Sequence, residues 1–265
     1  MWPQPGIAGE RPPAHGGASP RPEGASNSKL LTLNSQLSTL NSQLQLVGAR
    51  VLSCAAMAEG IGVSFEEVAK RYDLRVVFRG ISGEAVPAEV LVLTGPNGSG
   101  KSTLLAILCG LIRPTRGQVV HLKGGEEIPR GAWRQHLGVV APAMSVYEEL
   151  DAMENLRFFA RVRGMGAAEE RCRSCLELVG LDPDRTTVVR GFSTGMTQRL
   201  KIAQALLHDP GVLFLDEPGS NLDPAGQDWL EGHVADLAAA GKTVILATND
   251  RREMEWGTRR VALAG

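Results

Sequence analysis

Apolar and polar positions alternate in blocks along the chain from about residue 60 onward. Continuous apolar runs predict buried strands, because strands covered on both faces lack the alternation of half-buried ones. These runs are EVLVLTG (89–95), LGVVAP (137–142), VLFLD (212–216) and TVILATN (243–249). Helical patterns occur at 102–112, 154–164, 167–180, 194–209 and about 225–240. Strands that alternate with helices predict an α/β fold with a parallel sheet covered on both faces.

Two segments before the first buried run have a different pattern. VSFEEVAKRY (63–72) and LRVVFRGISGEAV (74–86) mix apolar and charged residues along their length. We expect them to form strands of an antiparallel layer.

Residues 1–57 differ from the rest in composition. The first 28 residues are dominated by Pro, Gly, Ala and Ser, so they bury too little surface to offset the entropy of ordering. A seven-residue repeat follows at 32–44 (TLNSQLSTLNSQL), with leucines at coiled-coil spacing but no charges beside them. We expect a disordered low-complexity segment at 1–57, with Met57 as the true start, and a folded domain at 58–265. A short dimerising helix at the repeat is the alternative.

Charge and composition narrow the class of protein. The 28 basic and 29 acidic side chains give a formal net charge of −1, which favours neither nucleic acid nor an anionic membrane surface as a partner. No stretch approaches the roughly 20 apolar residues of a membrane span. Four cysteines in 265 residues do not suggest a disulfide scaffold. We therefore expect a protein of the reducing cytosol that does not bind nucleic acid.

The segment GPNGSGKST (95–103) fits the phosphate-binding pattern G-x-x-x-x-G-K-[ST] and lies between a predicted strand and a predicted helix. Glycines let the backbone wrap a phosphate, and the start of a helix adds a favourable field for the anion. Lys101 is expected to reach the β- and γ-phosphates, and Ser102 to place its hydroxyl on Mg²⁺. The predicted nucleotide-binding residues here are Gly95, Pro96, Asn97, Gly98, Ser99, Gly100, Lys101, Ser102 and Thr103.

Polar side chains also follow two other apolar runs. Asp216 and Glu217 end VLFLDEP, where the chain turns and both carboxylates can face one site. We expect Asp216 to hold the metal through its water shell and Glu217 to polarise the attacking water. Asn249 ends the next run, and its amide can donate a hydrogen bond but cannot take up a proton. Ser193, in FSTGM (192–196), is placed to cap a helix, where Gly195 would let an anion approach closely.

Together these motifs resemble those of ATP-binding-cassette (ABC) ATPases. GPNGSGKST, FSTGM as a variant of the signature LSGGQ, LFLDEP and SNLDP occur in that family's order and spacing, over about residues 60–265. The resemblance implies a P-loop NTPase fold, an ABC nucleotide-binding domain with a mixed sheet, an antiparallel β layer and a helical subdomain inserted at about 144–192. It implies that ATP and Mg²⁺ bind, and that Tyr72 stacks on adenine.

The resemblance also implies partners. In the family, two copies form a head-to-tail dimer, so Ser193 and Gly195 of one copy would close over the ATP held by the other, with Asp223 at the dimer seam. The family's transport ATPases work beneath separate transmembrane permease subunits. This chain is therefore expected in the cytoplasm, at the inner face of the plasma membrane.

The sequence departs from the family's pattern at three places. Pro142 stands where the family has the Gln of its Q-loop, and Asn249 stands where the family has its switch His. In the signature, Thr194 and Met196 replace the first Gly and the Gln. We expect ATP binding and dimer closure to be intact, with Asn249 donating to a γ-phosphate oxygen, and hydrolysis to be slower or dependent on a partner.

The expected function is the ATP-hydrolysing subunit of an ABC transporter. The segment YEELDAMENLRFFARVRG (147–164) and the chain's length resemble the ATP-binding subunit of haem exporters of cytochrome c maturation. The alternatives are a soluble ABC ATPase that acts on ribosomes or DNA, and an ATP-gated clamp that barely hydrolyses ATP.

Overall fold

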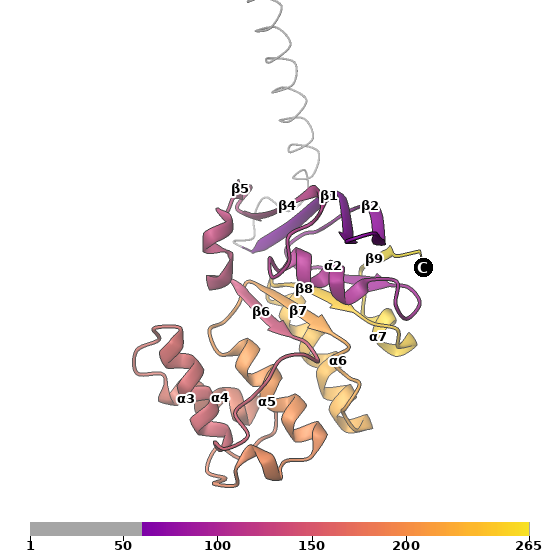
Figure 1. The fold of residues 1–265 in the computed structure, drawn as a ribbon. Helices are drawn as coiled ribbons and strands as arrows, with labels where there is room; N and C mark the ends of the chain where they lie inside the picture. The colour runs from indigo at the N-terminus through magenta and orange to yellow at the C-terminus, as the bar shows by residue number, and fades with distance from the viewer. Residues whose placement is uncertain (1–59, 265) are drawn as a thin grey trace, which may run out of the picture. The chain divides into compact units, whose positions relative to one another are not determined.

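The structure, a computed structural model, describes residues 60–264 (Figure 1). The expectations for residues 1–57, including the repeat and a start at Met57, lie outside the described residues. Within residues 60–264, a five-stranded and a four-stranded sheet form, and helices pack against them. Every helix in this part of the chain is too short or too polar to span a lipid bilayer.

The five-stranded sheet is parallel throughout and has the order β6-β7-β8-β3-β9. Its strands are β6 (Leu137–Val140), β7 (Val212–Asp216), β8 (Thr243–Ala247), β3 (Val90–Thr94) and β9 (Arg259–Ala262). Both β7 and β8 are buried along their whole length, as their continuous apolar sequences predict. Since the strands are parallel, the carboxyl ends of β3, β7 and β8 meet at one edge of the sheet.

The four-stranded sheet is antiparallel, with the order β2-β1-β4-β5. Its strands are β1 (Ile61–Tyr72), β2 (Arg75–Ala85), β4 (Arg116–Lys123) and β5 (Glu126–Glu127). β1 and β2 are the two strands predicted for this layer. The register of β1 against β2 shifts three times between Phe65 and Arg71, and such bulges re-aim side chains.

Three strands, β4, β5 and β9, have no sequence pattern that predicts them. In β4 (RGQVVHLK) only His121 is buried, and in β9 (RRVA) no residue is. Strands with so little burial lack the apolar run by which β3, β7 and β8 are recognised. Parallel and antiparallel strands thus occupy separate sheets.

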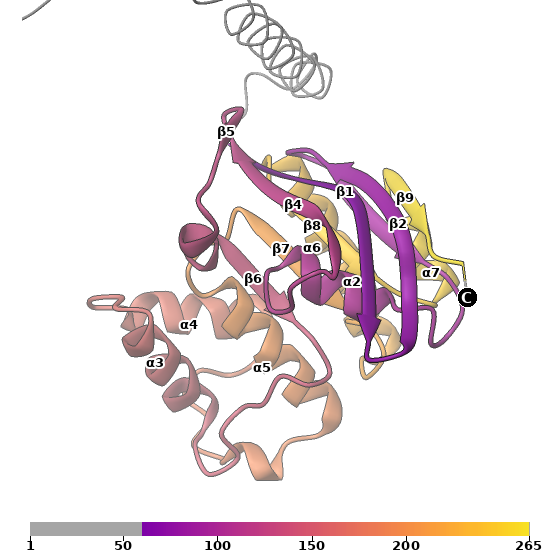
Figure 2. The same ribbon diagram turned by 45° about the horizontal axis from the view of Figure 1, so that its top comes forward.

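Helices cover both faces of the parallel sheet. α2 (Lys101–Leu108) lies between the two sheets and packs on Leu91 and Leu93 of β3 (Figure 2). α6 (Pro224–Ala239) packs on the opposite face, in one apolar cluster with Val90 and Val92. The helix predicted at 102–112 ends at Leu108, because Gly110 takes a left-handed conformation with φ of 80° that stops the helix.

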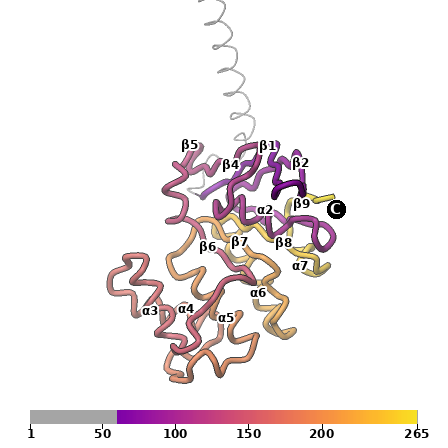
Figure 3. Tube along the Cα trace, viewed as in Figure 1, coloured from indigo at the N-terminus to yellow at the C-terminus, as the bar shows by residue number. Residues whose placement is uncertain are grey.

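Along the chain, three helices lie between β6 and β7, and in space they form one group (Figure 3). They are α3 (Ala152–Val162), α4 (Glu169–Leu178) and α5 (Thr194–Leu206). α3 begins at a capping box, in which Asp151 accepts from the Glu154 N–H and the Glu154 carboxylate accepts from the Asp151 N–H. The short elements are the 3₁₀ helices Arg130–Gln135 and Val189–Gly191, and α7 (Arg251–Glu255). The predicted fold class is confirmed, while the subdomain limits of 144–192 stay a prediction.

Candidate active site

A cavity of about 800 Å³ opens at the carboxyl edge of the parallel sheet. It lies between the turn that joins β1 to β2 and the loop that joins β3 to α2. The residues that line it are Tyr72, Arg75, Val76, Val77, Asn97, Gly98, Ser99, Gly100, Lys101, Ser102, Thr103, Glu217 and Asn249. The structure therefore brings most of the predicted site residues to one cavity, and it adds Arg75, Val76 and Val77, which no motif marked.

The loop between β3 and α2 is shaped by its glycines. Gly100 has φ of 98°, and a Cβ there would lie 2.7 Å from a Val77 methyl, so a side chain is excluded on two counts. Lys101, only 6% exposed, donates from Nζ to the carbonyls of Gly95 at 2.9 Å and Pro96 at 3.2 Å. The loop thus holds its own ammonium group at the cavity wall, where a phosphate oxygen could take the place of a carbonyl.

Ser102 and Asp216 form the predicted metal pair. The Ser102 hydroxyl donates to Asp216 Oδ1 at 2.9 Å. The pKa of the Asp216 carboxyl is raised above its usual value. Burial is the main cause and the nearby Glu217 adds to it, while the hydrogen bond from Ser102 acts in the opposite direction. Among residues 60–264 no cluster of three or more His, Cys, Asp or Glu could hold a metal ion by itself. A pair of hard oxygen ligands fits Mg²⁺, which takes its other ligands from water and phosphate.

Glu217 is the residue after β7 and lines the cavity. Its φ of 47° is unusual for a residue other than glycine, and its N–H donates to the Ala247 carbonyl of β8 at 2.9 Å. This turn lets both carboxylates face the site, since Asp216 contacts Ser102 while Glu217 reaches the cavity. Strained backbone held by its surroundings is common at functional sites.

Asn249 follows β8 and contacts the phosphate-binding loop directly. Its Nδ2 donates to Asn97 Oδ1 at 2.7 Å. Both side chains are exposed to solvent at the cavity. The amide that was predicted to reach a γ-phosphate is thus already paired, and it would have to exchange this partner for a phosphate oxygen.

Tyr72 and Pro142 lie at different places relative to the cavity. Tyr72 lines the cavity, is 47% exposed and carries the Lys70 ammonium 4.7 Å from its ring centre. Pro142 follows β6 and does not line the cavity; its carbonyl accepts from Lys201 Nζ at 3.3 Å. An adenine could stack on the free part of Tyr72, whereas Pro142 offers the cavity no side-chain ligand.

Ser193, Gly195 and Asp223 lie outside the cavity of their own chain. Ser193 caps α5 by accepting from the Met196 N–H at 3.2 Å, and Asp223 caps α6 by accepting from the Gly226 N–H at 3.1 Å. Asp223 also lies 3.6 Å from Arg199 Nη2. A Cβ on Gly195 would lie 3.1 Å from the Asn221 carbonyl, so the signature and the segment before α6 are neighbours.

A buried carboxyl that the sequence did not reveal connects two loops of the site. Glu253 of α7 is 5% exposed, and its Oε1 accepts from the Gly219 N–H at 2.8 Å. The pKa of Glu253 is raised above its usual value. Burial is the main cause and the charge of Asp250 adds to it, while hydrogen bonds with Thr248 and Gly219 act in the opposite direction. Glu253 thus ties the segment after Glu217 to the helix after Asn249. A lone Glu in RREME gave no signal of this, because the contact is 34 residues away along the chain.

A phosphate-binding loop between a strand and a helix, with two carboxylates at the end of a neighbouring parallel strand, defines a P-loop nucleotide-binding domain. The sequence profile of the family described as ABC transporter matches residues 78–220. This chain belongs to the ABC transporter family.

Curated relatives of the chain are ATP-binding proteins. Nod factor export ATP-binding protein I of Burkholderia pseudomallei is 38% identical over 197 residues, which are 73% of this chain and 64% of that protein. The probable multidrug ABC transporter ATP-binding protein YbhF of Escherichia coli is 38% identical over 173 residues, which are 64% of this chain and 30% of that protein. The matched part thus spans less than two thirds of these relatives.

Solved structures of similar fold include ATP-binding cassettes. One is an ATP binding subunit of an ABC transporter, with a TM-score of 0.67, 26% identity and coverage of 76% of this chain and 85% of that one. Another is the cassette MJ0796 in a dimeric post-hydrolysis state bound to ADP and Pi, with a TM-score of 0.68, 26% identity and coverage of 76% and 94%. The domain is an ABC nucleotide-binding domain.

Proposed function

We propose that this chain is the ATP-hydrolysing subunit of an ABC transporter. One observation carries the proposal: the phosphate-binding loop and Glu217 line a single cavity, and Ser102 of that loop is hydrogen-bonded to Asp216. Lys101 then neutralises charge on the nucleotide phosphates, and the loop's N–H groups orient them. Tyr72 stacks on the base.

Ser102 and Asp216 would hold Mg²⁺, which supplies charge neutralisation on the phosphates when it is bound. Glu217 orients and polarises the water that attacks the terminal phosphorus, a role that needs its carboxylate only in the transition state. Asn249 exchanges its bond to Asn97 for a hydrogen bond to the terminal phosphate. Because an amide cannot titrate, it positions this group without relaying a proton.

We propose that a second copy of the chain, or a homologous subunit, completes the site. Ser193 and Gly195 lie outside the cavity of their own chain, at a helix start suited to an anion. In a head-to-tail dimer they would close over the ATP of the partner, with Asp223 at the seam. The cassette MJ0796, which has a similar fold and is dimeric, supports the formation of a dimer.

We propose that the chain works from the cytoplasm, beneath separate permease subunits at the inner face of the plasma membrane. An exposed aromatic pair offers an apolar contact for such a subunit: Tyr147 is 44% exposed, Phe158 is 39% exposed, and their rings lie 4.7 Å apart. The name of the Nod factor export relative favours export as the direction of transport. The curated relatives do not support haem export for cytochrome c maturation, and we leave the cargo open.

The second candidate is a clamp that closes on ATP and hydrolyses it slowly. It is favoured by Asn249, which cannot relay a proton, and by Pro142, which places no metal or water ligand at the cavity. The two candidates share the nucleotide site and differ in turnover.

The test is phosphate release from ATP by the purified chain, with and without Mg²⁺. We expect release that requires Mg²⁺ and is lost in Asp216→Asn, while Asp236→Asn, a change of an exposed carboxylate on α6, keeps it. Mg²⁺-dependent ATP binding without measurable release would favour the clamp. Absence of ATP binding in the parent chain would refute both candidates.

A further inference from the structure

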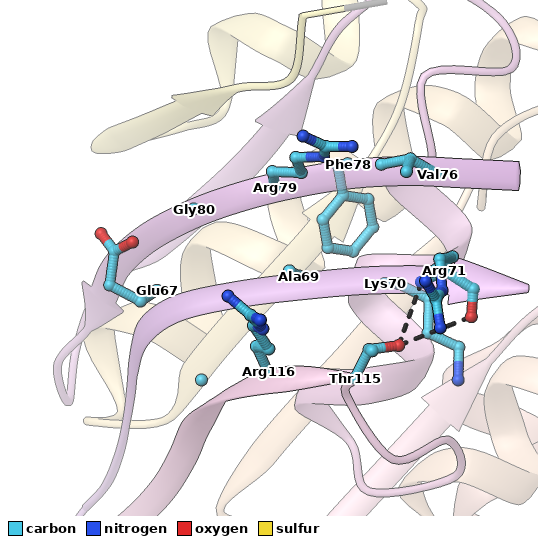
Figure 4. Close-up of a pocket in the computed structure, with 11 residues that line it drawn as sticks. Glu67, Ala69, Lys70, Arg71, Val76, Phe78, Arg79, Gly80, Thr115 and Arg116 are labelled. Carbon is cyan, nitrogen blue, oxygen red and sulfur yellow. Dashed lines mark hydrogen bonds between the residues drawn. The ribbon is translucent and has the colours of Figure 1, made fainter. Parts of the chain in front are cut away.

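A second hollow, of about 790 Å³, lies on the antiparallel layer (Figure 4). Its walls come from β1, from β2 and from the segment that enters β4. Its lining includes basic residues, which are Lys70, Arg71, Arg79 and Arg116, and apolar residues, which are Ala69, Val76 and Phe78. Glu67 is the one carboxylate among the residues that line it.

None of the basic side chains of this hollow forms an ion pair within residues 60–264, although Glu67 lines the same hollow. Among residues 60–264, Arg71, Arg79 and Arg116 form no ion pair, whereas arginines elsewhere, such as Arg173 and Arg259, do. Lys70 Nζ donates to the backbone carbonyl of Arg113 at 2.9 Å and lies over the Tyr72 ring. Four basic residues and one carboxylate line the hollow, so positive charge is in excess there and an anion would be bound favourably.

The backbone of β1 and of the segment that enters β4 shapes this hollow. The bulges of β1 open its pairing with β2, and Glu67 within them has φ of 48°. Thr115 fixes the rim, because its N–H donates to the Ala69 carbonyl at 2.8 Å and its hydroxyl accepts from the Arg71 N–H at 3.1 Å. Gly117 lets this segment approach β1, since a Cβ there would lie 2.4 Å from the Glu66 carbonyl.

The floor of the hollow is apolar and adjoins the nucleotide site. Phe78 extends from β2 toward β1 in Figure 4 and is buried. The ring of Phe78 packs against the phosphate-binding loop, because a Cβ on Gly100 would lie 2.8 Å from it. Val76 lines both the hollow and the nucleotide cavity. A basic rim over an apolar floor suits a molecule with an anionic group on an apolar body.

We propose that this hollow is a second ligand site, distinct from the nucleotide site, that binds an amphipathic anion such as a phosphate group on an alkyl chain. The arginines bind the anionic group, and Ala69, Val76 and Phe78 contact the apolar body. The same chemistry is found in a soluble alkyl phosphate and in the headgroup region of an anionic lipid.

The test is titration calorimetry of the full chain with hexyl phosphate, inorganic phosphate and hexanol. We expect hexyl phosphate to bind at least about tenfold more tightly than either of the others, because only it has both groups. Arg79→Glu and Arg116→Glu should each weaken it by about tenfold or more. The matched control, Arg134→Glu, reverses the charge of an exposed arginine outside the hollow and should leave the affinity unchanged. Melting temperatures within a degree or two of the parent's would show that the variants fold.

Several outcomes would overturn the proposal. These are equal binding of hexyl phosphate and inorganic phosphate, equal loss in Arg134→Glu, and displacement of hexyl phosphate by ATP in the absence of Mg²⁺, which would place the probe in the nucleotide cavity. Binding to vesicles of phosphatidic acid but not phosphatidylcholine, lost in Arg79→Glu, would identify a lipid as the source of the anion. Binding of the free alkyl phosphate alone would identify a soluble molecule. ATP hydrolysis is not needed for any of these readings, so they stand apart from the test of the ATPase.

Discussion

The hydrogen bond between Asn249 and Asn97 allows two roles of Asn249 to be separated. Asn249→Ala removes the donor, and Asn97→Ala removes the acceptor that holds it at 2.7 Å. If Asn249 binds the terminal phosphate, only the first change removes that hydrogen bond. If Asn249 merely fastens the phosphate-binding loop, the two changes remove the same contact and have the same effect.

The expected loss of kcat depends on whether Asn249 donates to a neutral amide or to a charged phosphate oxygen. A hydrogen bond between neutral, exposed amides contributes about 0.5–1.5 kcal/mol, which is a few-fold to about tenfold in rate, whereas a bond to a charged oxygen contributes about 1.5–3 kcal/mol, which is roughly ten- to hundredfold. We therefore expect Asn249→Ala to lower kcat about ten- to hundredfold with ADP affinity nearly unchanged, because ADP lacks the terminal phosphate. Asn97→Ala should lower kcat only a few-fold.

Steady-state ATP hydrolysis at saturating Mg²⁺ and ATP, together with ADP binding by calorimetry, measures both effects. Asn249→His restores a donor that also titrates near neutral pH, so its rate should equal or exceed that of the parent. Equal losses in Asn97→Ala and Asn249→Ala, with no further loss in the double variant and with ATP and ADP affinity falling together, would refute the phosphate-sensing role.

Four further predictions concern binding, chemistry and stability. Lys101→Ala should weaken ATP binding at least about tenfold by fluorescent-nucleotide titration, since it removes a charge-assisted bond; parental affinity would contradict its role. Glu217→Gln should bind ATP normally and sediment as an ATP-bound dimer, and a monomer that hydrolyses normally would speak against this role. Burial lowers the pKa of His121 from 6.5 to about 4. The stability that neutral His121 contributes to the fold is therefore present above pH 6.5 and is lost toward pH 4, by about 2 kcal/mol at pH 5. Urea unfolding at pH 6.5 and pH 5 should show this loss, and His121→Phe, which keeps a ring against Trp133, should reduce it. The remainder is due in part to His208, whose pKa burial also lowers to about 4. A chain that starts at Met57 should match the full chain in ATPase rate and melting temperature, and a large loss would show that residues 1–56 belong to the fold.

The strands that position the site could be predicted because a continuous apolar sequence indicates a strand that is buried on both faces. β7 is apolar from Val212 to Leu215 and β8 from Val244 to Ala247, and polar residues follow each run, so their carboxyl ends could be located from the sequence alone. β4 and β9 could not, since their place depends on pairing with β1 and β3 and not on an apolar run of their own. Secondary structure that is set by a distant partner leaves little local signal.

Some site residues are likewise identified by a local sequence pattern, whereas others are revealed only by the fold. The glycines, Lys101 and Ser102 lie in one short segment whose spacing is fixed by the phosphate it wraps, so a local pattern identifies them. The bond from Asn249 to Asn97 and the burial of Glu253 depend on distances between segments far apart in the chain. Position in the sequence gave Asn249 its place at the site, but only the fold gives its partner.

The contact of Gly219 with Glu253 limits how this protein can vary over generations. A Cβ at 219 would lie 2.4 Å from Glu253 Oε1, so any other residue there must displace the carboxylate that accepts from its own N–H. Shortening the side chain at 253 makes room but leaves that N–H without its acceptor. Neither position can therefore drift alone, and an engineer who wishes to randomise the segment after Glu217 has to diversify both codons in the same library.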